Sequence, residues 1–168
     1  MSAIKLTAED LSLLREALSY DPETGKFYWR TKVSIKTVVG REAGSLWPSG
    51  YVAIRVFGQR YMAHRLAWAF IHGELPDCDV DHENRIKSDN RISNLRLATR
   101  SQNMANTELR RTNTSGVKGV YWCKRTNRWV ARVMKNGKHI WVGAYQDLNI
   151  AAVKVREAHE QAFGSFSP

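Results

Sequence analysis

The amino-acid sequence predicts an α+β fold. We expect a strand–loop–strand–helix unit in the middle of the chain, preceded by a hairpin and a helix, and a C-terminal three-stranded antiparallel sheet packed on one helix. Short runs of alternating side chains beside turn signals indicate the hairpins, and apolar residues at helical spacing indicate the helices. The chain of 168 residues, with 43% apolar and 25% charged residues, suits one ordinary soluble domain or two small ones.

The first half of the chain is predicted to hold a helix, a short strand and a hairpin that leads into a second helix. Thr7 and the acidic residues after it are typical of a helix start, and leucines follow at helical spacing. Residues 26–30 follow a turn and read as a strand. Residues 51–62 form a predicted hairpin whose two-residue turn is Gly58 and Gln59, and the amphipathic helix after it ends at a glycine.

The last part of the chain changes to short strands joined by turns. Residues 117–122, 129–135 and 138–142 read as strands, and Asn136-Gly137 between the last two is a strong signal for a tight hairpin turn. A capped amphipathic helix follows them. The predicted regions are residues 1–44 without an assignable motif, residues 45–110 with the central unit, and residues 113–168 with the C-terminal sheet and helix.

Positive charge is concentrated in one stretch near the C-terminus. The chain has 26 Lys and Arg against 16 Asp and Glu, a net charge of +10. Residues 109–146 hold nine of these bases and no acid, whereas residues 1–108 hold 15 bases and 13 acids. Bases interleaved with tyrosines and tryptophans suit a nucleic acid, which offers phosphates and flat rings. A solvated basic face on an ordinary sheet is the alternative.

Several protein classes are excluded by what the sequence lacks. No run of about 18 apolar residues exists, so we expect neither a membrane-spanning helix nor a membrane partner. Cys78 and Cys123 are far apart and form no CxxC pair, which argues against a disulfide scaffold and a structural zinc site. Acidic residues stand where a signal peptide needs an apolar core. We therefore expect a cytoplasmic protein of a bacterial or host cell, close to the nucleoid and not secreted.

A polar segment in the middle of the chain has the residue types of a catalytic site. Asp81 and His82 end a predicted strand, a polar loop follows, and a second strand starts at Asn94. Asn103 lies in the first turn or so of the next predicted helix. A hairpin that folds back onto this helix would bring Asp81, His82 and Asn103 together. Carboxylate and amide oxygens suit magnesium, and an imidazole can take a proton from water.

These residues resemble the HNH nuclease motif, in the variant whose last histidine is replaced by asparagine. Eleven residues separate His82 from Asn94, and eight separate Asn94 from Asn103, as in the family. The surrounding sequence is similar to HNH homing-type endonucleases of phages and includes HRLAWAF, DHENRIKSDNRISNLR and SQNMAN. The resemblance covers about residues 45–108 and implies a ββα-metal fold.

The resemblance implies a role for each motif residue. One divalent ion lies between Asp81 and Asn103, with Mg²⁺ expected and Mn²⁺ as the alternative. His82 acts as general base on the attacking water, and Asn94 holds the loop so that the histidine keeps its orientation. Asparagine at position 103 weakens the ligand set, so that water and DNA phosphate must complete the shell. The implied reaction is metal-assisted hydrolysis of phosphodiester bonds in double-stranded DNA, and a monomer or a dimer is left open.

Four other polar residues near the motif are interpreted as structural. Asn84 and Asn90 lie in the polar loop and read as turn residues. His64 and Arg65 lie near a helix start, where they could support the site, although packing inside the protein is the simpler interpretation.

The C-terminal part of the chain resembles the Apetala-two (ethylene-response-factor) DNA-binding domain and reads SGVKGVYWCKRTNRWVARVMKNGKHIWVGAYQDLNIAAVKV. The resemblance covers about residues 113–163 and implies that one sheet face enters the major groove of DNA. Strand alternation puts Arg128, Arg132, His139 and Trp141 on the free face, and Trp129 on the helix side. The predicted DNA contacts are Arg85, Lys87, Arg96 and Arg100 around the motif, and Trp122, Lys124, Arg125, Arg128, Arg132, His139 and Trp141 in this module.

Three functions follow from these features. The first is a metal-dependent DNA endonuclease whose C-terminal module binds duplex DNA. The second is a catalytically inactive DNA-binding regulator on the same scaffold, against which the intact Asp81, His82 and Asn103 argue. The third is an RNA-binding protein, which the charge alone favours and which leaves the motif unexplained.

Overall fold

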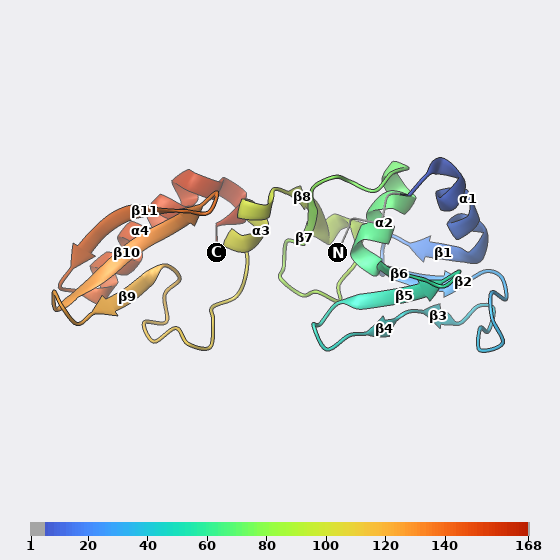
Figure 1. Ribbon diagram of the computed structural model, residues 1–168, viewed down its shortest axis with the longest axis horizontal. Coiled ribbons are helices and arrows are strands. Elements are labelled where there is room, and N and C mark those ends of the chain that lie inside the picture. The colour runs from blue at the N-terminus through green and yellow to red at the C-terminus, as the bar shows by residue number, and fades with distance from the viewer. Residues whose placement is uncertain (1–5, 168) are drawn as a thin grey trace. The chain divides into compact units, whose positions relative to one another are not determined.

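Helices and small antiparallel sheets succeed one another along the chain, which confirms the predicted α+β class. The structure is a computed structural model that describes residues 6–167 (Figure 1). The chain up to Leu97 forms one unit, and the chain from Ala98 onward forms a second. Within the part of the chain that is described, no helix is long and apolar enough to span a membrane.

Among the described residues, the first unit contains two α-helices, one 3₁₀ turn and three small sheets. The sheets have the strand orders β1-β2-β3, β4-β5-β6 and β7-β8. The elements in chain order are α1 (Ala8–Ala17), β1 (Leu18–Asp21), β2 (Lys26–Trp29), β3 (Glu42–Ala43), β4 (Ser45–Leu46), β5 (Val52–Val56), β6 (Gln59–Met62), α2 (Ala63–His72), β7 (Asp79–His82) and β8 (Leu95–Ala98).

Local side-chain chemistry explains several boundaries of these elements. The Thr7 side chain accepts a hydrogen bond from the backbone of Asp10, and the Asp10 side chain accepts one from the backbone of Thr7, so a capping box starts α1. α2 ends at Gly73, whose φ of 87° is the left-handed conformation that glycine adopts without a Cβ penalty.

The turn between β5 and β6 lies one residue earlier than the sequence predicted. Val56 pairs with Gln59, so the two turn residues are Phe57 and Gly58. Both have positive φ, 50° and 77°, as the favoured two-residue hairpin turn requires. The prediction of Gly58 and Gln59 is therefore wrong. Phe57 itself takes the left-handed conformation, and its side chain is exposed.

One core joins the N-terminal elements to the central ones. Phe27 of β2, Ile54 of β5 and Leu66 of α2 are fully buried in the same cluster, which also includes residues of α1, β7 and β8. The predicted boundary between residues 1–44 and 45–110 therefore differs from the division of the structure. The reason is that apolar side chains of both parts are buried in the same cluster.

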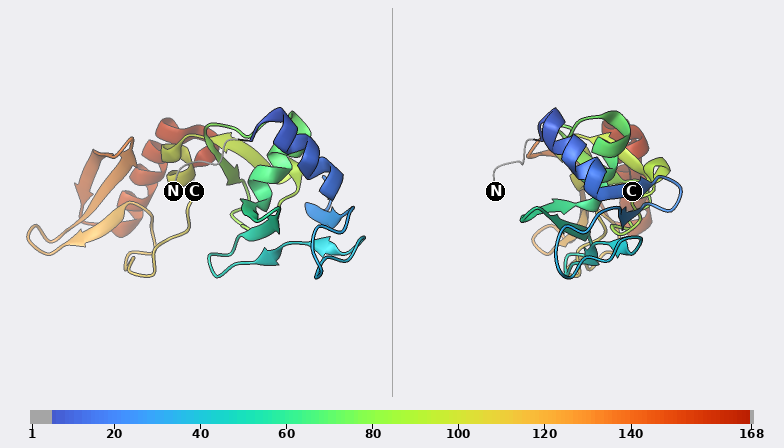
Figure 2. Two further views of the ribbon diagram at one scale, coloured as in Figure 1. Left: turned by 45° about the vertical axis from the view of Figure 1, so that its right-hand side comes forward. Right: turned by 90° about the vertical axis from the view of Figure 1, so that its right-hand side faces the viewer.

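Up to residue 167, the second unit consists of a short helix, a three-stranded antiparallel sheet, a long helix and a final 3₁₀ turn, Gly164–Phe166. The strand order is β11-β10-β9, and α4 lies along one face of the sheet (Figures 1 and 2). The φ angles of Asn136 and Gly137, 51° and 74°, confirm the predicted hairpin turn between β10 and β11. The elements are α3 (Arg100–Ala105), β9 (Val120–Cys123), β10 (Arg128–Lys135), β11 (Lys138–Tyr145) and α4 (Leu148–Phe163).

Helix α3 packs with the C-terminal sheet, although the sequence assigned it to the central region. Its residue Ala105 is buried in the same cluster as Val133 of β10. The Lys118 ammonium donates to the Ala105 carbonyl at 2.6 Å, and the Ser101 hydroxyl accepts from the backbone of Asn136 at 2.9 Å. Lys118 thereby satisfies carbonyls that the end of a helix leaves without partners.

Candidate active site

The connection from β7 to β8 carries the central motif. Asp81 and His82 are the last two residues of β7, and both are buried, with 6% and 4% of their surface exposed. The loop after them returns through a single 3₁₀ turn, Ile92–Asn94, into β8. The Glu83 amide donates to the Asn94 carbonyl at 2.9 Å and closes the loop at its base.

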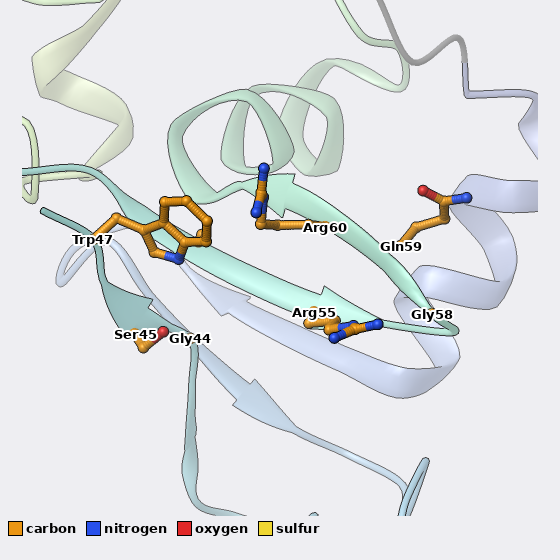
Figure 3. Close-up of a pocket in the computed structure, with 8 residues that line it drawn as sticks. Gly44, Ser45, Trp47, Arg55, Gly58, Gln59 and Arg60 are labelled. Carbon is orange, nitrogen blue, oxygen red and sulfur yellow. The ribbon is translucent and has the colours of Figure 1, made fainter. Parts of the chain in front are cut away.

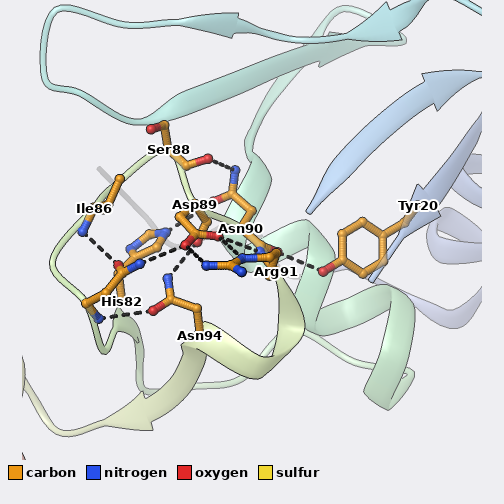
Figure 4. Close-up of polar contacts among 9 residues, drawn as sticks. Tyr20, His82, Ile86, Ser88, Asp89, Asn90, Arg91 and Asn94 are labelled. Atoms are coloured by element: carbon orange, nitrogen blue, oxygen red, sulfur yellow. Dashed lines mark hydrogen bonds and ion pairs between the residues drawn. The ribbon is translucent and has the colours of Figure 1, made fainter. Parts of the chain in front are cut away.

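Asn94 ties the two ends of this loop together (Figure 4). Its side-chain oxygen accepts a hydrogen bond from the Asn84 amide at 3.0 Å, and its side-chain nitrogen donates to the Asp89 carbonyl at 2.8 Å. The Asn84 side chain in turn donates to the Asp89 carboxylate at 2.7 Å. These contacts give Asn94 a structural role, because they fix the loop that follows His82.

Asp89 is held as an anion within the loop. Arg91 donates to both carboxylate oxygens, at 2.8 and 2.6 Å. The hydrogen bond from Arg91 lowers the pKa of Asp89 to about 2, although partial burial opposes the shift. Asp89 therefore places a permanent negative charge near His82.

Asn90 sets the tautomer of His82. The Asn90 side-chain nitrogen donates to the Ser88 carbonyl at 3.2 Å, so the amide oxygen is the atom that faces His82 Nε2, at 3.1 Å (Figure 4). An amide oxygen can only accept, so Nε2 carries the proton and Nδ1 carries none. An imidazole in this form accepts a proton at Nδ1. The interpretation of Asn90 as a mere turn residue is therefore incomplete, because its side chain orients the histidine.

The surroundings of His82 keep the imidazole neutral. Burial lowers its pKa below the usual value of 6.5, while the hydrogen bond to Asn90 and the charges of Asp81 and Asp89 oppose that shift. A neutral imidazole at neutral pH is the form that a general base needs. The same two carboxylates stabilise the positive charge that the ring acquires once it has taken a proton.

The β1–β2 hairpin contacts the His82 loop and holds its backbone. The Tyr20 hydroxyl of β1 donates to the Asn90 carbonyl at 2.7 Å, and the Pro22 carbonyl accepts from the Ile92 amide at 3.2 Å. Gly25 lies so close to the loop that an added Cβ would stand 2.4 Å from the Arg91 nitrogen and 2.5 Å from the Asn90 carbonyl carbon. Residues 1–44, which carry no motif, thus include the contacts that hold Asn90 in place.

Two aromatic side chains pack against His82 from other elements. The ring of His64, at the start of α2, lies 5.1 Å from the His82 ring, and the ring of Tyr51 lies 5.9 Å from it. Among the residues that the structure describes, the buried Nδ1 of His64 has no hydrogen-bond partner. Burial lowers the pKa of His64 to about 3, so this ring is neutral as well. His64 is packed inside the protein, as the sequence predicts, and the side chain that it packs against is His82, the candidate base.

Asp81 has the chemistry of a ligand for a hard divalent ion. Its buried carboxylate accepts a hydrogen bond from Arg96 Nε at 3.1 Å, and Arg96 also lies 3.9 Å from the Glu83 carboxylate. Within residues 6–167 no cluster of three or more His, Cys, Asp and Glu side chains is placed to hold a metal ion. The buried carboxylate of Asp81 suits magnesium, which is commonly held by one or two protein carboxylates and completes its shell with water and phosphate.

The remaining motif residue lies in the second unit. Asn103 is part of α3, together with Arg100, and the capping box that Thr99 and Gln102 form starts this helix as the sequence predicted. The role of Asn103 as a second metal ligand stays a prediction.

The basic residues predicted around the motif differ in their surroundings. Arg85 is exposed and has a φ of 66°, and Lys87 is exposed on the same loop. The Lys87 ammonium donates to the Ser49 carbonyl at 2.9 Å and lies 5.1 Å from the centre of the Tyr51 ring. Arg96, in contrast, is only 16% exposed and is engaged by carboxylates, so it builds the site rather than presenting a free cation.

The free face of the C-terminal sheet carries most of the residues predicted for it. Arg132 pairs in register with Trp141, and Met134 with His139, on the side away from Ala131 and Val133, which pack in the core with α4. Trp141 is 64% exposed. Lys124, Arg125 and Arg128 are exposed at and beside the β9–β10 turn.

Trp122 does not lie on this face. It stands opposite Trp129 in register, and the two rings meet edge to face at 5.1 Å, which puts Trp122 on the helix side. The expected placement is therefore wrong. Tyr121 shares the free face with Val130 instead, and the Arg132 guanidinium lies 4.8 Å from the centre of its ring. The register in which β9 pairs with β10 determines which β9 side chains lie on the free face, and strand alternation along β10 does not give that register.

Comparison with known proteins identifies the central part of the chain. Residues 61–105 match the family model described as HNH endonuclease, so the chain contains an HNH endonuclease domain there. Such nucleases generally use a divalent metal. The chain is also 33% identical over 76 residues to protein 3.8 of Escherichia phage T7, a match over 45% of this chain and 63% of the phage protein. The chain thus spans less than two thirds of that relative. No solved structure matches the chain significantly.

Proposed function

We propose that the protein is a DNA endonuclease that hydrolyses phosphodiester bonds with His82 as general base. The observation that carries this proposal is the buried His82 whose Nε2 faces the Asn90 side-chain oxygen at 3.1 Å, next to the buried carboxylate of Asp81. The HNH endonuclease domain at residues 61–105, which includes all three residues, supports the same reaction class.

His82 takes a proton from the attacking water in this mechanism. Its Nδ1 accepts the proton as the water oxygen forms a bond to phosphorus, and the leaving 3′-oxygen departs. The imidazole becomes positively charged, and the nearby carboxylates of Asp81 and Asp89 stabilise that charge. Base catalysis of this kind contributes about 10²- to 10⁴-fold in rate.

A divalent ion belongs to the proposal, with Mg²⁺ first and Mn²⁺ as the alternative. Asp81 would hold it, and Asn103 is the second ligand that the resemblance implies. When bound, such an ion stabilises the charge of the phosphate and of the leaving oxygen. Arg96 keeps the carboxylate of Asp81 oriented through its hydrogen bond at 3.1 Å.

The C-terminal module would bind double-stranded DNA through its free face, in the manner of the Apetala-two-like domain that its sequence resembles. The face combines exposed bases with flat rings and has no acid between residues 109 and 146. Tyr121 replaces Trp122 among the proposed contacts, because it lies beside Arg132. The contacts are Tyr121, Lys124, Arg125, Arg128, Arg132, His139 and Trp141.

Cleavage of a supercoiled plasmid tests this function. With Mg²⁺, the wild-type protein is expected to nick or break the plasmid, and EDTA is expected to stop it. His82→Ala should lower the rate by about 10²- to 10⁴-fold. His72→Ala is the matched control, because His72 is exposed at the end of α2 and lies outside the loop. A His82→Ala protein that cuts as fast as the His72→Ala control would contradict the proposed base.

The engagement of Asp81 by Arg96 favours one second candidate, the DNA-binding regulator that does not cut. A carboxylate whose charge is already balanced by a guanidinium that is only 16% exposed needs no ion. Duplex binding without cleavage in either Mg²⁺ or Mn²⁺ would establish this candidate in place of the nuclease.

A further inference from the structure

The outer face of the sheet β4-β5-β6 gathers basic and aromatic side chains outside the His82 loop. In β5 and β6, Ile54 and Tyr61 pair on the core side, so Arg55 and Arg60 stand on the opposite side. With Trp47 they border a shallow depression of about 600 Å³ (Figure 3). The residues that line it are Gly44, Ser45, Trp47, Ala53, Arg55, Gly58, Gln59 and Arg60.

Arg55 and Arg60 form an uncompensated like-charge pair. They are directly opposite each other in register, and like charges in this position destabilise a sheet. None of the eight lining residues is acidic, and within residues 6–167 neither arginine forms an ion pair. The repulsion between the two arginines does not stabilise the sheet. The pair does provide two cations for a ligand that brings negative charge.

The ring of Trp47 contacts one of the two arginines. The Arg60 guanidinium lies 4.0 Å from the centre of the Trp47 ring. A guanidinium over an indole ring is attracted to the ring face and still has N–H groups able to donate to another partner. The fork of donors on a guanidinium matches the oxygens of a phosphate, and the indole offers a flat surface to a sugar or a base.

A short turn connects this face to the candidate base. The Trp47 amide donates to the Tyr51 carbonyl at 2.8 Å, and the Gly50 amide donates to the Trp47 carbonyl at 2.8 Å. Tyr51, at the far end of the turn, packs on His82, and Lys87 of the His82 loop donates to Ser49 within the turn. The face and the base therefore belong to one connected structure.

We propose that Trp47, Arg55 and Arg60 bind the sugar-phosphate backbone of the DNA beside the bond that is cut, and so hold the substrate against the His82 loop. This inference rests on the proposed function and adds a second DNA contact in the first unit. No sequence motif indicates this contact surface. The Lys and Arg residues between positions 109 and 146 account for most of the net charge, and Arg55 and Arg60 are isolated along the chain.

Duplex binding in EDTA tests the inference without cleavage. The affinity of full-length protein for a short fluorescent duplex is measured by anisotropy between about 50 and 200 mM salt. Arg55→Gln with Arg60→Gln should weaken binding about tenfold at about 0.1 M salt and reduce the slope of log affinity against log salt by about two. Lys154→Ala with Arg156→Ala, on the exposed side of α4, removes the same charge and should change the slope much less. Equal slopes for the two double variants would overturn the inference.

A stability readout separates lost contacts from lost folding. Arg55→Gln alone removes the repulsion between the strands, so its melting temperature should equal or exceed that of the wild type while its affinity falls. A lower melting temperature together with unchanged affinity would give Arg55 a structural role and overturn its assignment to DNA. Tighter binding to single-stranded RNA than to the duplex, lost in the same double variant, would overturn the choice of DNA.

The inference and the proposed function fail in different ways. If the wild type cuts DNA and the Arg55/Arg60 double variant binds DNA as well as the Lys154/Arg156 control, the proposed nuclease function is supported and the face at Trp47 does not bind DNA. If the wild type binds duplex DNA through these arginines and cuts no DNA, the DNA contact at this face is supported and the proposed nuclease function is contradicted.

Discussion

Arg91 of the His82 loop and Arg96 of β8 are paired with carboxylates, whereas within residues 6–167 Arg128 and Arg132 of the C-terminal sheet form no ion pair. Arg91 and Arg96 donate to carboxylates at 2.6 and 3.1 Å. Arg128 and Arg132 lie in a stretch, residues 109–146, that contains no acidic residue at all. The first pair shapes the surroundings of the candidate base, and the second pair adds positive charge to an open face. Substitutions around the His82 loop should therefore change the rate of cleavage, and those on the free face of the C-terminal sheet should change DNA affinity.

Among substitutions that leave His82 itself in place, the largest effect is expected for Asn90→Ala. Loss of the acceptor for His82 Nε2 allows the ring to turn or to change tautomer, and partners that orient a catalytic ligand typically contribute about 10- to 100-fold. The rate at saturating DNA should fall by that factor while affinity stays unchanged. Asn84→Ala is the control, because it changes the same loop without touching His82. Equal rates for the two variants would remove Asn90 from its positioning role.

Gly25→Ala should destabilise the first unit next most strongly. A Cβ there meets backbone atoms of the loop at 2.4 and 2.5 Å, and φ is +72°. The free energy of unfolding in urea should fall by about 1 to 3 kcal/mol. Gly40→Ala isolates the clash, since Gly40 has a similar φ of +80° and nothing within 4 Å. An equal loss for both would mean that only backbone strain matters at position 25.

Arg128→Ala with Arg132→Ala tests the other side of the comparison. Removal of two phosphate contacts should lower the salt slope of duplex binding by about two and leave the cleavage rate at saturating DNA unchanged. The variant Lys154→Ala with Arg156→Ala again serves as the control, because α4 covers the opposite face of the sheet. A salt slope equal to that of the control would show that the chosen face does not bind.

The smallest effect concerns the stability of the first unit in mild acid. The pKa of His64 is about 3 in the folded protein and about 6.5 when unfolded, so only the unfolded chain takes up a proton as the pH falls through 6.5. The free energy of unfolding should therefore fall, by about 1 kcal/mol for this residue between pH 7 and 5.5. His64→Phe should lack this part of the loss, and exposed His139→Phe should keep it. The same pH dependence in both variants would contradict the burial of His64.

Features set by neighbouring residues could be predicted from the sequence. Capping at Thr7 and Thr99 and the Asn136-Gly137 turn depend on side chains a few positions apart, and all three are present in the structure. The motif spacing around His82 likewise indicated the HNH domain, which the family match over residues 61–105 supports.

Contacts between distant residues could not be predicted. The bond from Tyr20 to Asn90 spans 70 positions, and the packing of His64 on His82 depends on where α2 lies. Trp122 was placed on the wrong face because alternation says which residues share a side, but not how β9 registers with β10. The depression at Trp47 could not be predicted, because Arg55 and Arg60 come together only through the pairing of β5 with β6.

Nitrogen-15 NMR of the histidine rings at neutral pH tests the central claim most directly, with His82→Ala used to assign the His82 signals. The tautomer set by Asn90 predicts a proton on Nε2 of His82 and none on Nδ1. A proton on Nδ1, or on both nitrogens, would contradict the assignment of this imidazole as the base.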